Sequence, residues 1–244
     1  KSYVFGGGND PVRTWEMINI MQRNKIAVYK VAKAEKLDGK SFSTEDGFVV
    51  PTNQPQHRLI KSLFERRTTF EDSAFYDVSA WTLPHSMNVP FAESTTAVQL
   101  GTKVETNDFP AGTVIGKGAL AYLVEWDGYF VGRAIYDLLE KGMAVKVAME
   151  PFTTTINGKS KEFGYGTIEI QTQGKDISGL LEELAKRDGL TFYGVNSGLT
   201  SAGIDLGSEK FKRVEMPKIL MATGPGVDNL SAGEVWHLLD QRMD

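Results

Sequence analysis

The sequence predicts an α/β protein with two duplicated flavodoxin-like halves, whose parallel or mixed sheets are flanked by helices, plus the start of a third βα unit. Three observations lead to this fold class. Motifs of the first half recur in the second at a constant spacing, short apolar strands alternate with amphipathic helices, and Gly, Pro or Asn punctuates the boundaries.

The repeat is the strongest of these observations. Tyr3-Val4-Phe5 matches Tyr122-Leu123-Val124 at an offset of 119 residues (from 3 to 122). Gly39-Lys40 matches Gly158-Lys159, the residues from Gly47 match those from Gly166, and Gln54 matches Gln173, at the same offset. A repeat of this length indicates two similar domains rather than a solenoid, whose repeats are shorter.

In the first half, a strand at 3–5 is followed by a helix with Asp10 as N-cap and Pro11 as first residue, ending at Asn24. A strand at 26–31 would complete a βαβ unit with parallel strands. The remaining elements are a turn at 37–40, a strand at 47–50 and a helix opened by Pro55 with an apolar stripe of Leu59, Ile60, Leu63 and Phe64.

The second half repeats this order. We expect strands at 120–125, 144–149, 166–171 and 191–195, a turn at Asn157-Gly158, and helices at 129–141 and from Asp176 to Gly189. A third unit would comprise a strand at 219–222, a turn at 224–226 and a helix with a Ser231–Glu234 capping box.

These elements divide the chain into four segments: 1–92 as the first α/β half, 93–118 as a linker rich in Thr, Gly and Pro, 119–216 as the second half, and 217–244 as a truncated third unit. The sequence starts at Lys1, just before the predicted buried strand at 3–5, and stops at Asp244, directly after a predicted helix. We therefore expect a piece of a longer protein, whose signal peptide would lie upstream.

Composition narrows the classes of function. The 244 residues carry a net charge of −4 with mixed signs, which argues against nucleic acid as a partner. No apolar run approaches the roughly 20 residues of a membrane span. With no cysteine, the chain has neither a thiol nucleophile nor a thiolate metal site.

Three loops that follow strands are candidates for a ligand-binding cleft. Gly6–Asp10 could bind an anion at a helix N-terminus, although Pro11 stands where the dinucleotide fingerprint needs its third glycine, and a tight turn is the alternative. The candidate residues of the three loops are Gly7, Gly8, Asp10, Trp126, Asp127, Gly224 and Asp228.

Residues 64–85 gather arginines, carboxylates and aromatic rings. One interpretation is a polar cleft with aromatic walls and an arginine clamp for a carboxylate; the other is a buried helix and loop held by Arg–Asp contacts. The candidate residues here are Arg66, Arg67, Asp72, Asp77 and Trp81.

No catalytic or metal-ligating residue is predicted. His57, His85 and His237 form no zinc-binding spacing, and no G-x-S-x-G elbow is present. A metalloenzyme in which folding joins His57 and His85 with Glu71 or Asp72 is a third alternative.

The stretch ERRTTFEDSAFYDVSAWTLPHSMNVPF, with VVPTNQPQHRLIKSLF before it and GVNSGLTSAGIDLGSEKF and SAGEVWHLLDQR after it, carries a family resemblance. It resembles the region downstream of the catalytic domain in bacterial zinc carboxypeptidase-like proteins, which is similar to a class I glutamine amidotransferase-like α/β fold. The peptidase zinc motif and the amidotransferase cysteine are both missing from this chain, so no catalytic residue carries over.

The resemblance implies a non-catalytic accessory domain that packs on or assists an upstream peptidase domain of the same protein, with a peptide substrate as a further partner. It implies a periplasmic or secreted parent hydrolase that holds zinc, with no cofactor in this chain. The alternative from the residues is a small-ligand-binding α/β protein with a cleft at the carboxyl ends of its strands.

Overall fold

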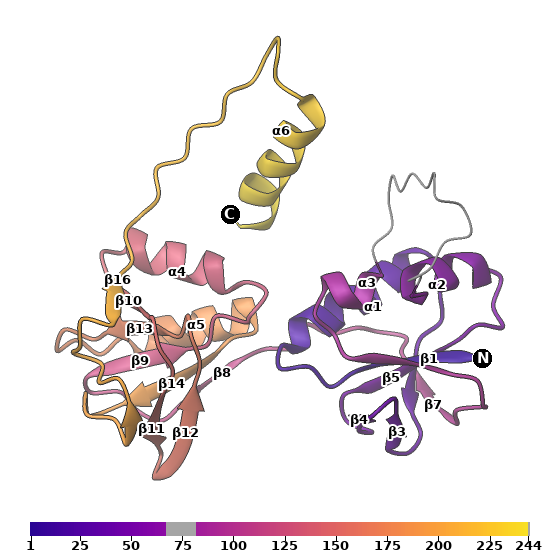
Figure 1. Ribbon diagram of the computed structural model, residues 1–244, viewed down its shortest axis with the longest axis horizontal. Helices are drawn as coiled ribbons and strands as arrows, with labels where there is room; N and C mark the ends of the chain where they lie inside the picture. The colour runs from indigo at the N-terminus through magenta and orange to yellow at the C-terminus, as the bar shows by residue number, and fades with distance from the viewer. Residues whose placement is uncertain (67–81, 244) are drawn as a thin grey trace. The chain divides into compact units, whose positions relative to one another are not determined.

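The structure is a computed structural model that describes residues 1–66 and 82–243 (Figure 1). The chain divides into two compact units, unit 1 (Lys1–Pro110) and unit 2 (Ala111–Asp244). Both units combine a sheet with covering helices, so the protein has a mixed α/β fold, as the sequence predicts.

Unit 1 is built on a five-stranded sheet with the order β6-β1-β5-β2-β7, in which every neighbouring pair is antiparallel. A separate hairpin, β3–β4, is inserted between β2 and β5. The elements are β1 (Ser2–Gly6), α1 (Pro11–Arg23), β2 (Tyr29–Val31), β3 (Glu35–Leu37), β4 (Lys40–Phe42), β5 (Gly47–Pro51), α2 (His57–Phe64), α3 (Leu83–Ser86), β6 (Phe91–Ser94) and β7 (Leu100–Lys103).

The predicted βαβ unit of parallel neighbours is not what forms. β1 and β2 do point the same way, because both run antiparallel to β5, but β5 lies between them. The strand expected at 26–31 also begins later, at Tyr29. The flavodoxin-like arrangement is therefore not confirmed, since its neighbouring strands would be parallel.

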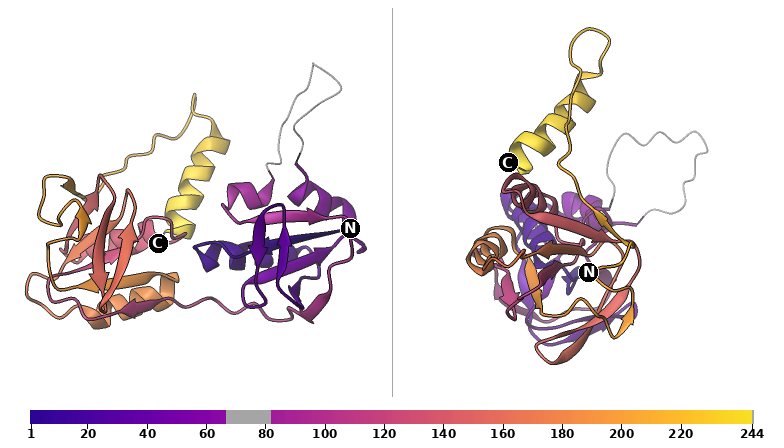
Figure 2. Two further views of the ribbon diagram at one scale, coloured as in Figure 1. Left: turned by 60° about the horizontal axis from the view of Figure 1, so that its bottom comes forward. Right: turned by 90° about the vertical axis from the view of Figure 1, so that its left-hand side faces the viewer.

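The sheet of unit 1 is covered on both faces (Figures 1 and 2). Helices α1, α2 and α3 lie on one face, where Phe5 and Val50 of the sheet pack with Met17 of α1 and Phe64 of α2. The β3–β4 hairpin covers the other face, where Phe42 packs on Val49. Alternate residues of β5 thus pack into two different cores, because successive side chains of a strand point to opposite faces of the sheet.

Unit 2 has a six-stranded sheet with the order β16-β10-β13-β9-β14-β8, in which only the β8–β14 pair is parallel among the described pairs. A three-stranded sheet, β12-β11-β15, accompanies it. The elements are β8 (Thr113–Ile115), β9 (Ala121–Val124), α4 (Val131–Glu140), β10 (Ala144–Ala148), β11 (Phe152–Ile156), β12 (Lys159–Phe163), β13 (Ile168–Gln171), α5 (Ser178–Asp188), β14 (Thr191–Val195), β15 (Ala202–Gly203), β16 (Phe211–Arg213), α6 (Asn229–Trp236) and the π-helical η1 (His237–Arg242).

The two units share one order of elements around the sheet. When four strands of unit 1 (β1, β2, β5 and β6) are numbered 1 to 4 along the chain, their order in the sheet is 4-1-3-2. Four strands of unit 2 (β9, β10, β13 and β14), numbered in the same way, have the same order in their sheet. Each unit places a helix after its first and third strands and a hairpin between its second and third. This is the split β-α-β, or ferredoxin-like, arrangement with an inserted hairpin.

Strand register corrects the predicted offset at one place. Tyr3 pairs with Val50 in unit 1, and Tyr122 pairs with Ile170 in unit 2. The first strands are thus 119 residues apart (3 to 122), whereas the third strands are 120 apart (50 to 170). A slip of one residue changes the face of every side chain, so Glu169 corresponds in the structure to Val49.

The inserted hairpins have the predicted turns. Asp38 and Gly39 join β3 to β4, and Asn157 and Gly158 join β11 to β12. All four have positive φ angles between 48° and 76°. Two residues with positive φ define the type I′ turn, whose twist matches that of the strands, so both hairpins close in the same way.

Residues 93–118, which the composition predicts to be a linker, supply strands to both units. β7 is an edge strand of unit 1, and β8 is an edge strand of unit 2. The division between the units falls within this segment, after Pro110.

The C-terminal segment differs most from prediction. Residues 219–222 form no strand, and Leu220 is 97% exposed. The N-cap of α6 is Asp228, whose carboxylate accepts hydrogen bonds from the Ser231 amide and hydroxyl, so the predicted capping box at Ser231 is wrong. No residue of α6 or η1 is buried.

Candidate functional site

The candidate site is a pocket in unit 1 beside the N-terminus of α1, with a volume of about 310 Å³. Strand β1 ends at Gly6, and the chain turns through Gly7 and Gly8 into the helix. Asp10 caps the helix by accepting a hydrogen bond from the Val12 amide at 2.9 Å, as predicted. The pocket is lined by Gly7, Gly8, Pro11, Thr14, Trp15, Ile18, Glu45, Asp46, Phe48, Asn107, Asp108 and Pro110.

Two glycines allow the chain to pass close to Asp46. Gly6 has φ +114°, and a Cβ at this position would lie 2.1 Å from the Asp46 carbonyl oxygen. Gly7 has φ +71°, and a Cβ there would lie 3.7 Å from the Asp46 carboxylate. Only glycine fits both the backbone angle and the space at Gly6, so this loop is built around Asp46.

The charge of the pocket does not suit an anion. Glu45, Asp46 and Asp108 all line it, and no lysine or arginine does among the described lining residues. Carboxylates repel an anion, although the helix N-terminus alone would attract one. The pocket therefore does not favour the anion predicted at Gly6–Asp10, and its carboxylates suit a ligand that carries positive charge or hydroxyl groups.

Hydrogen bonds hold the far wall of the pocket against α1. The Trp15 indole N–H donates to the Asn107 carbonyl oxygen at 2.8 Å, and the Asn107 amide donates to the Trp15 carbonyl oxygen at 2.9 Å. The Asn107 amide also donates to Asn19 Oδ1, and Phe109 packs edge-on against Trp15. The segment that sequence composition marks as linker is therefore ordered by α1.

Lys30 supports the opposite wall without lining the pocket. Its ammonium lies 4.0 Å from the centre of the Phe48 ring and donates to the Glu45 carbonyl oxygen. Burial lowers the pKa of Lys30, while the charge of Asp46 acts in the opposite direction. Phe48 is thereby held between the ammonium and the pocket.

Of the residues that line the pocket, sequence reasoning named Gly7 and Gly8 but missed Glu45, Asp46, Asn107 and Asp108. Asp10, also named, caps α1 and is not among the lining residues. Asp46 directly precedes the strand that pairs with β1, so a prediction of antiparallel pairing would have found it. No sequence motif indicated Asn107 and Asp108, because they belong to an irregular segment that is distant in sequence from the Gly6–Asp10 loop.

The other candidates lie elsewhere. Trp126, Asp127, Gly224 and Asp228 all belong to unit 2, and Trp126 packs beside Gly166 while Asp228 caps α6. Arg66 lies in unit 1 with its guanidinium over the Phe91 ring. Arg67, Asp72, Asp77 and Trp81 fall outside the described residues.

The histidines occupy different surroundings. His57 begins α2 at the surface, His85 packs on Phe91, and His237 lies in η1. Within residues 1–66 and 82–243, no group of three or more histidine, aspartate or glutamate side chains is placed to hold a metal ion. Glu71 and Asp72 lie outside that part of the chain.

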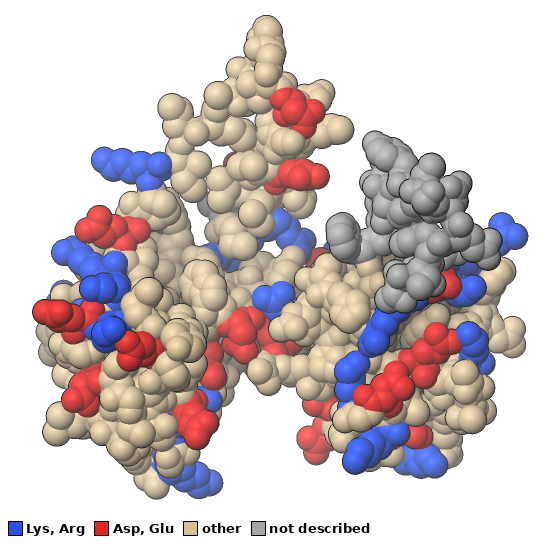
Figure 3. All heavy atoms as spheres, in the orientation of Figure 1, with Lys and Arg blue, Asp and Glu red and all other residues tan. Residues whose placement is uncertain are grey.

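Charged side chains of both signs are intermixed on the visible faces of both units (Figure 3). Among the described helices, none has the length and apolar character that crossing a bilayer demands. No family model, curated protein or solved structure matches this chain.

Proposed function

We propose that this chain is a non-catalytic accessory domain of a zinc carboxypeptidase-like protein, where it packs on or assists the peptidase domain. The family resemblance of the sequence supports this, as does the lack of cysteine and of a zinc-binding histidine spacing. The parent would hold the zinc, and its place would be periplasmic or secreted.

The exposed apolar segment at 219–239 is the structural observation that carries this proposal. Leu220 is 97% exposed, Leu230 75% and Ile219 62%, and few charged side chains interrupt the visible surface of this segment (Figure 3). Contiguous apolar surface of this kind is typical of a protein contact. A further domain of the parent protein is the partner that we propose for it.

Two measurements test the accessory role. The purified chain, stripped with chelator and given zinc again, should retain no tightly bound zinc and should hydrolyse no peptide. One tight zinc per chain, lost in His57→Ala and His85→Ala, would contradict the proposal. Removal of residues 1–244 from the parent protein should lower peptidase activity or solubility.

The second candidate function, binding of a small ligand, is favoured by the pocket beside α1. Trp15 and Phe48 supply aromatic walls, Asn107 an amide oxygen, and Asp46 a carboxylate. This combination suits a ligand with ammonium or hydroxyl groups, such as an amine or a sugar. We expect thermal stabilisation by members of an amine, amino-acid and sugar panel, since a ligand of the folded state raises stability.

The matched variants for this test are Asp46→Asn and Asp38→Asn. Asp46 lines the pocket, whereas Asp38 lies in the β3–β4 turn, where asparagine also tolerates a positive φ. Asp46→Asn should abolish the stabilisation, and Asp38→Asn should keep it. A flat response to the whole panel would count against ligand binding.

We also propose that units 1 and 2 arose by internal duplication. The shared strand order, the two hairpins with the same turn and the recurring sequence motifs support this proposal.

A further inference from the structure

Unit 1 holds a second cluster of polar side chains, separate from the pocket beside α1. Three basic residues from three parts of the chain surround one aromatic ring, that of Phe91 at the start of β6. Lys40 begins β4, Arg66 follows α2, and His85 belongs to α3. Because these elements are far apart in the sequence, only the fold brings the three basic groups together.

The Phe91 ring holds the cations in place. The Arg66 guanidinium carbon lies 4.6 Å from the ring centre, and the Lys40 ammonium lies 5.4 Å from it. The His85 ring meets Phe91 edge-on with 5.0 Å between centroids. Phe91 itself is 3% exposed, so its position is fixed by the core. Stacking on an aromatic face orients the planar fork of an arginine.

Most of the hydrogen-bonding capacity of these cations is left for a ligand. Lys40 donates to the Phe91 carbonyl oxygen at 2.7 Å, which uses one of its three N–H groups. Within residues 1–66 and 82–243, neither Lys40 nor Arg66 forms an ion pair with a carboxylate. Two cations on one ring, with no carboxylate paired to either among the described residues, favour binding of an anion beside them.

A pocket of about 310 Å³ opens beside this cluster. Lys40 and His85 contribute the basic groups, Asn88 contributes an amide, and none of the described lining residues is acidic. The apolar part of the wall is formed by Pro84, Val89, Pro90 and Phe91. Its charge is the reverse of that of the pocket beside α1.

We propose that this second pocket binds an oxyanion, the carboxylate or phosphate group of a ligand whose apolar part lies on the proline-lined wall. Lys40, which lines the pocket, would hold the oxygens through charge-assisted hydrogen bonds, and Arg66 over the Phe91 ring would add positive charge beside it. The site goes beyond the proposed function and does not depend on it.

The test is a titration of the ¹⁵N-labelled chain with acetate and, separately, inorganic phosphate at constant ionic strength, followed by amide chemical shifts. We expect saturable shifts at Asn88 and Phe91. The double variant Lys40→Gln/Arg66→Gln should weaken binding by about tenfold or more, the loss expected for charge-assisted bonds. Response to acetate alone would identify a carboxylate site, and response to both anions a general oxyanion site.

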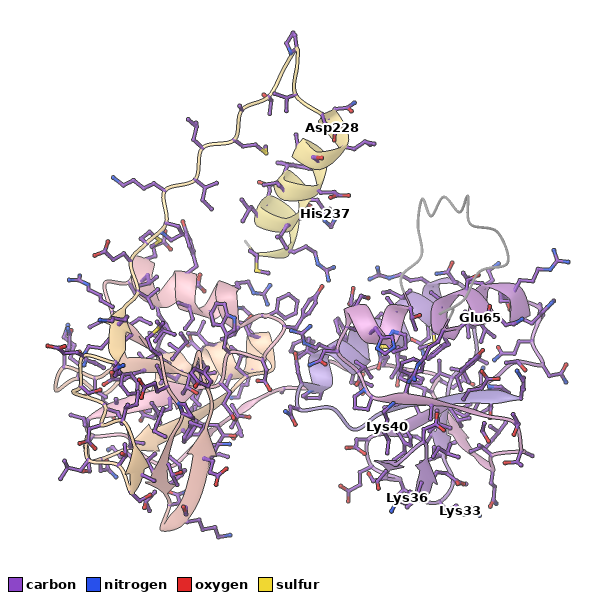
Figure 4. The ribbon with its side chains drawn as sticks, in the orientation of Figure 1. Lys33, Lys36, Lys40, Glu65, Asp228 and His237 are labelled. Carbon is purple, nitrogen blue, oxygen red and sulfur yellow. The ribbon has the colours of Figure 1, made fainter. Side chains whose placement is uncertain are left out.

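The matched control is Lys33→Gln/Lys36→Gln, which removes the same charge from the same unit. Lys33 and Lys36 are exposed, and neither is among the described residues that line this pocket (Figure 4). The control should bind like the unmodified chain. Lys40→Arg, which keeps the positive charge, should keep the binding that Lys40→Gln loses. Equal weakening in both double variants, or no saturable shift with either anion, would overturn the proposal.

Discussion

Units 1 and 2 share the order of four strands, but different interactions hold their covering helices in place. In unit 1, Phe64 of α2 packs on Tyr3 at 4.8 Å, on Phe5 at 5.7 Å and on Phe91 at 6.2 Å between ring centres. In unit 2, the fully buried carboxylate of Asp188, at the end of α5, accepts hydrogen bonds from Arg133 of α4 and from Arg187.

The difference shows that the sheet order does not dictate the chemistry of the helix layer. Arg187 also reaches Asp137 of α4 at 2.6 Å, and hydrogen bonds to Asp188 and Asp137 raise the pKa of the Arg187 guanidinium. The same strand order is thus compatible with an aromatic cluster in unit 1 and an ionic network in unit 2. We expect the two units to respond differently to substitution for this reason.

Phe64→Ala is expected to have the largest effect, a loss of about 3–5 kcal/mol in the free energy of unfolding, because it leaves a cavity among three rings. Hydrogen exchange followed by mass spectrometry should show faster exchange in β1, β5 and α2. Exchange in unit 2 serves as the internal control and should stay unchanged. Equally faster exchange in β9 and β13 would show that the units unfold together.

Asp188→Ala should destabilise unit 2 by about 3 kcal/mol, since it leaves two arginines beside an empty buried position. The effect should appear as faster exchange in α4 and α5, with unit 1 as the control. Asp188→Asn keeps the size and part of the hydrogen bonding, so it should cost less. An equal loss in the two variants would contradict a contribution from the size and hydrogen bonds of the side chain and would assign the whole cost to the lost charge.

The central strands give a second contrast, between Val49 and Glu169. Val49 is buried under the β3–β4 hairpin. Glu169 holds the corresponding place in β13 with 2% exposure, and its Oε2 has no hydrogen-bond partner among the described residues. Lys146 Nζ lies 4.0 Å from that oxygen, beyond hydrogen-bonding distance. Unit 2 thus buries a carboxylate where unit 1 buries a methyl group.

Glu169→Gln should raise the free energy of unfolding at pH 7 by about 1–2 kcal/mol, because it removes a desolvated charge. Burial raises the pKa of Glu169 above its ordinary value of 4.5, against the lowering effects of Gln171 and Lys146. The folded state therefore binds the proton more tightly, and this stabilising contribution is present below pH 4.5 and lost as pH rises through the raised pKa. Urea denaturation of both proteins from pH 4 to pH 8 checks this, and a difference independent of pH would contradict it.

Gly39→Ala and Gly158→Ala should have the smallest effects, about 1–2 kcal/mol each, from the cost of a positive φ in a residue with a Cβ. Nothing lies within 4 Å of the added Cβ at either position, so the backbone angle alone sets the cost. Thermal denaturation should give losses of similar size. Gly39→Asn, which tolerates the angle, should cost less than Gly39→Ala.

Local features could be predicted from the sequence because a few neighbouring residues decide them. Asp10 and Pro11 start α1, Asn24 ends it, and Gly189 ends α5 in a left-handed conformation. The turns at Asp38-Gly39 and Asn157-Gly158 follow from residues that tolerate positive φ. Gly7 and Gly8 of the pocket could be named for the same reason, because they belong to a glycine-rich loop between a strand and a helix.

Pairing of distant segments could not be predicted in the same way. The insertion of β5 between β1 and β2 leaves no mark in either strand, because a buried strand is apolar whatever its neighbour. The apolar run at Ile219–Ala222 has the composition of a strand but no partner in the described chain. The walls formed by Asn107 and Asp108, and the basic groups around Phe91, depend on contacts of the same long range.

The sequence by itself determined the two hairpin turns, the start and end of α1, the end of α5 and the motifs that recur in its two halves. These properties depend on backbone angles, caps and periodicity within a few residues. Only the tertiary structure decided which strands are neighbours, which face Glu169 occupies and which charges meet in each pocket. Those properties depend on pairing over long sequence separations, where many registers satisfy the same local pattern and only the packed core selects one.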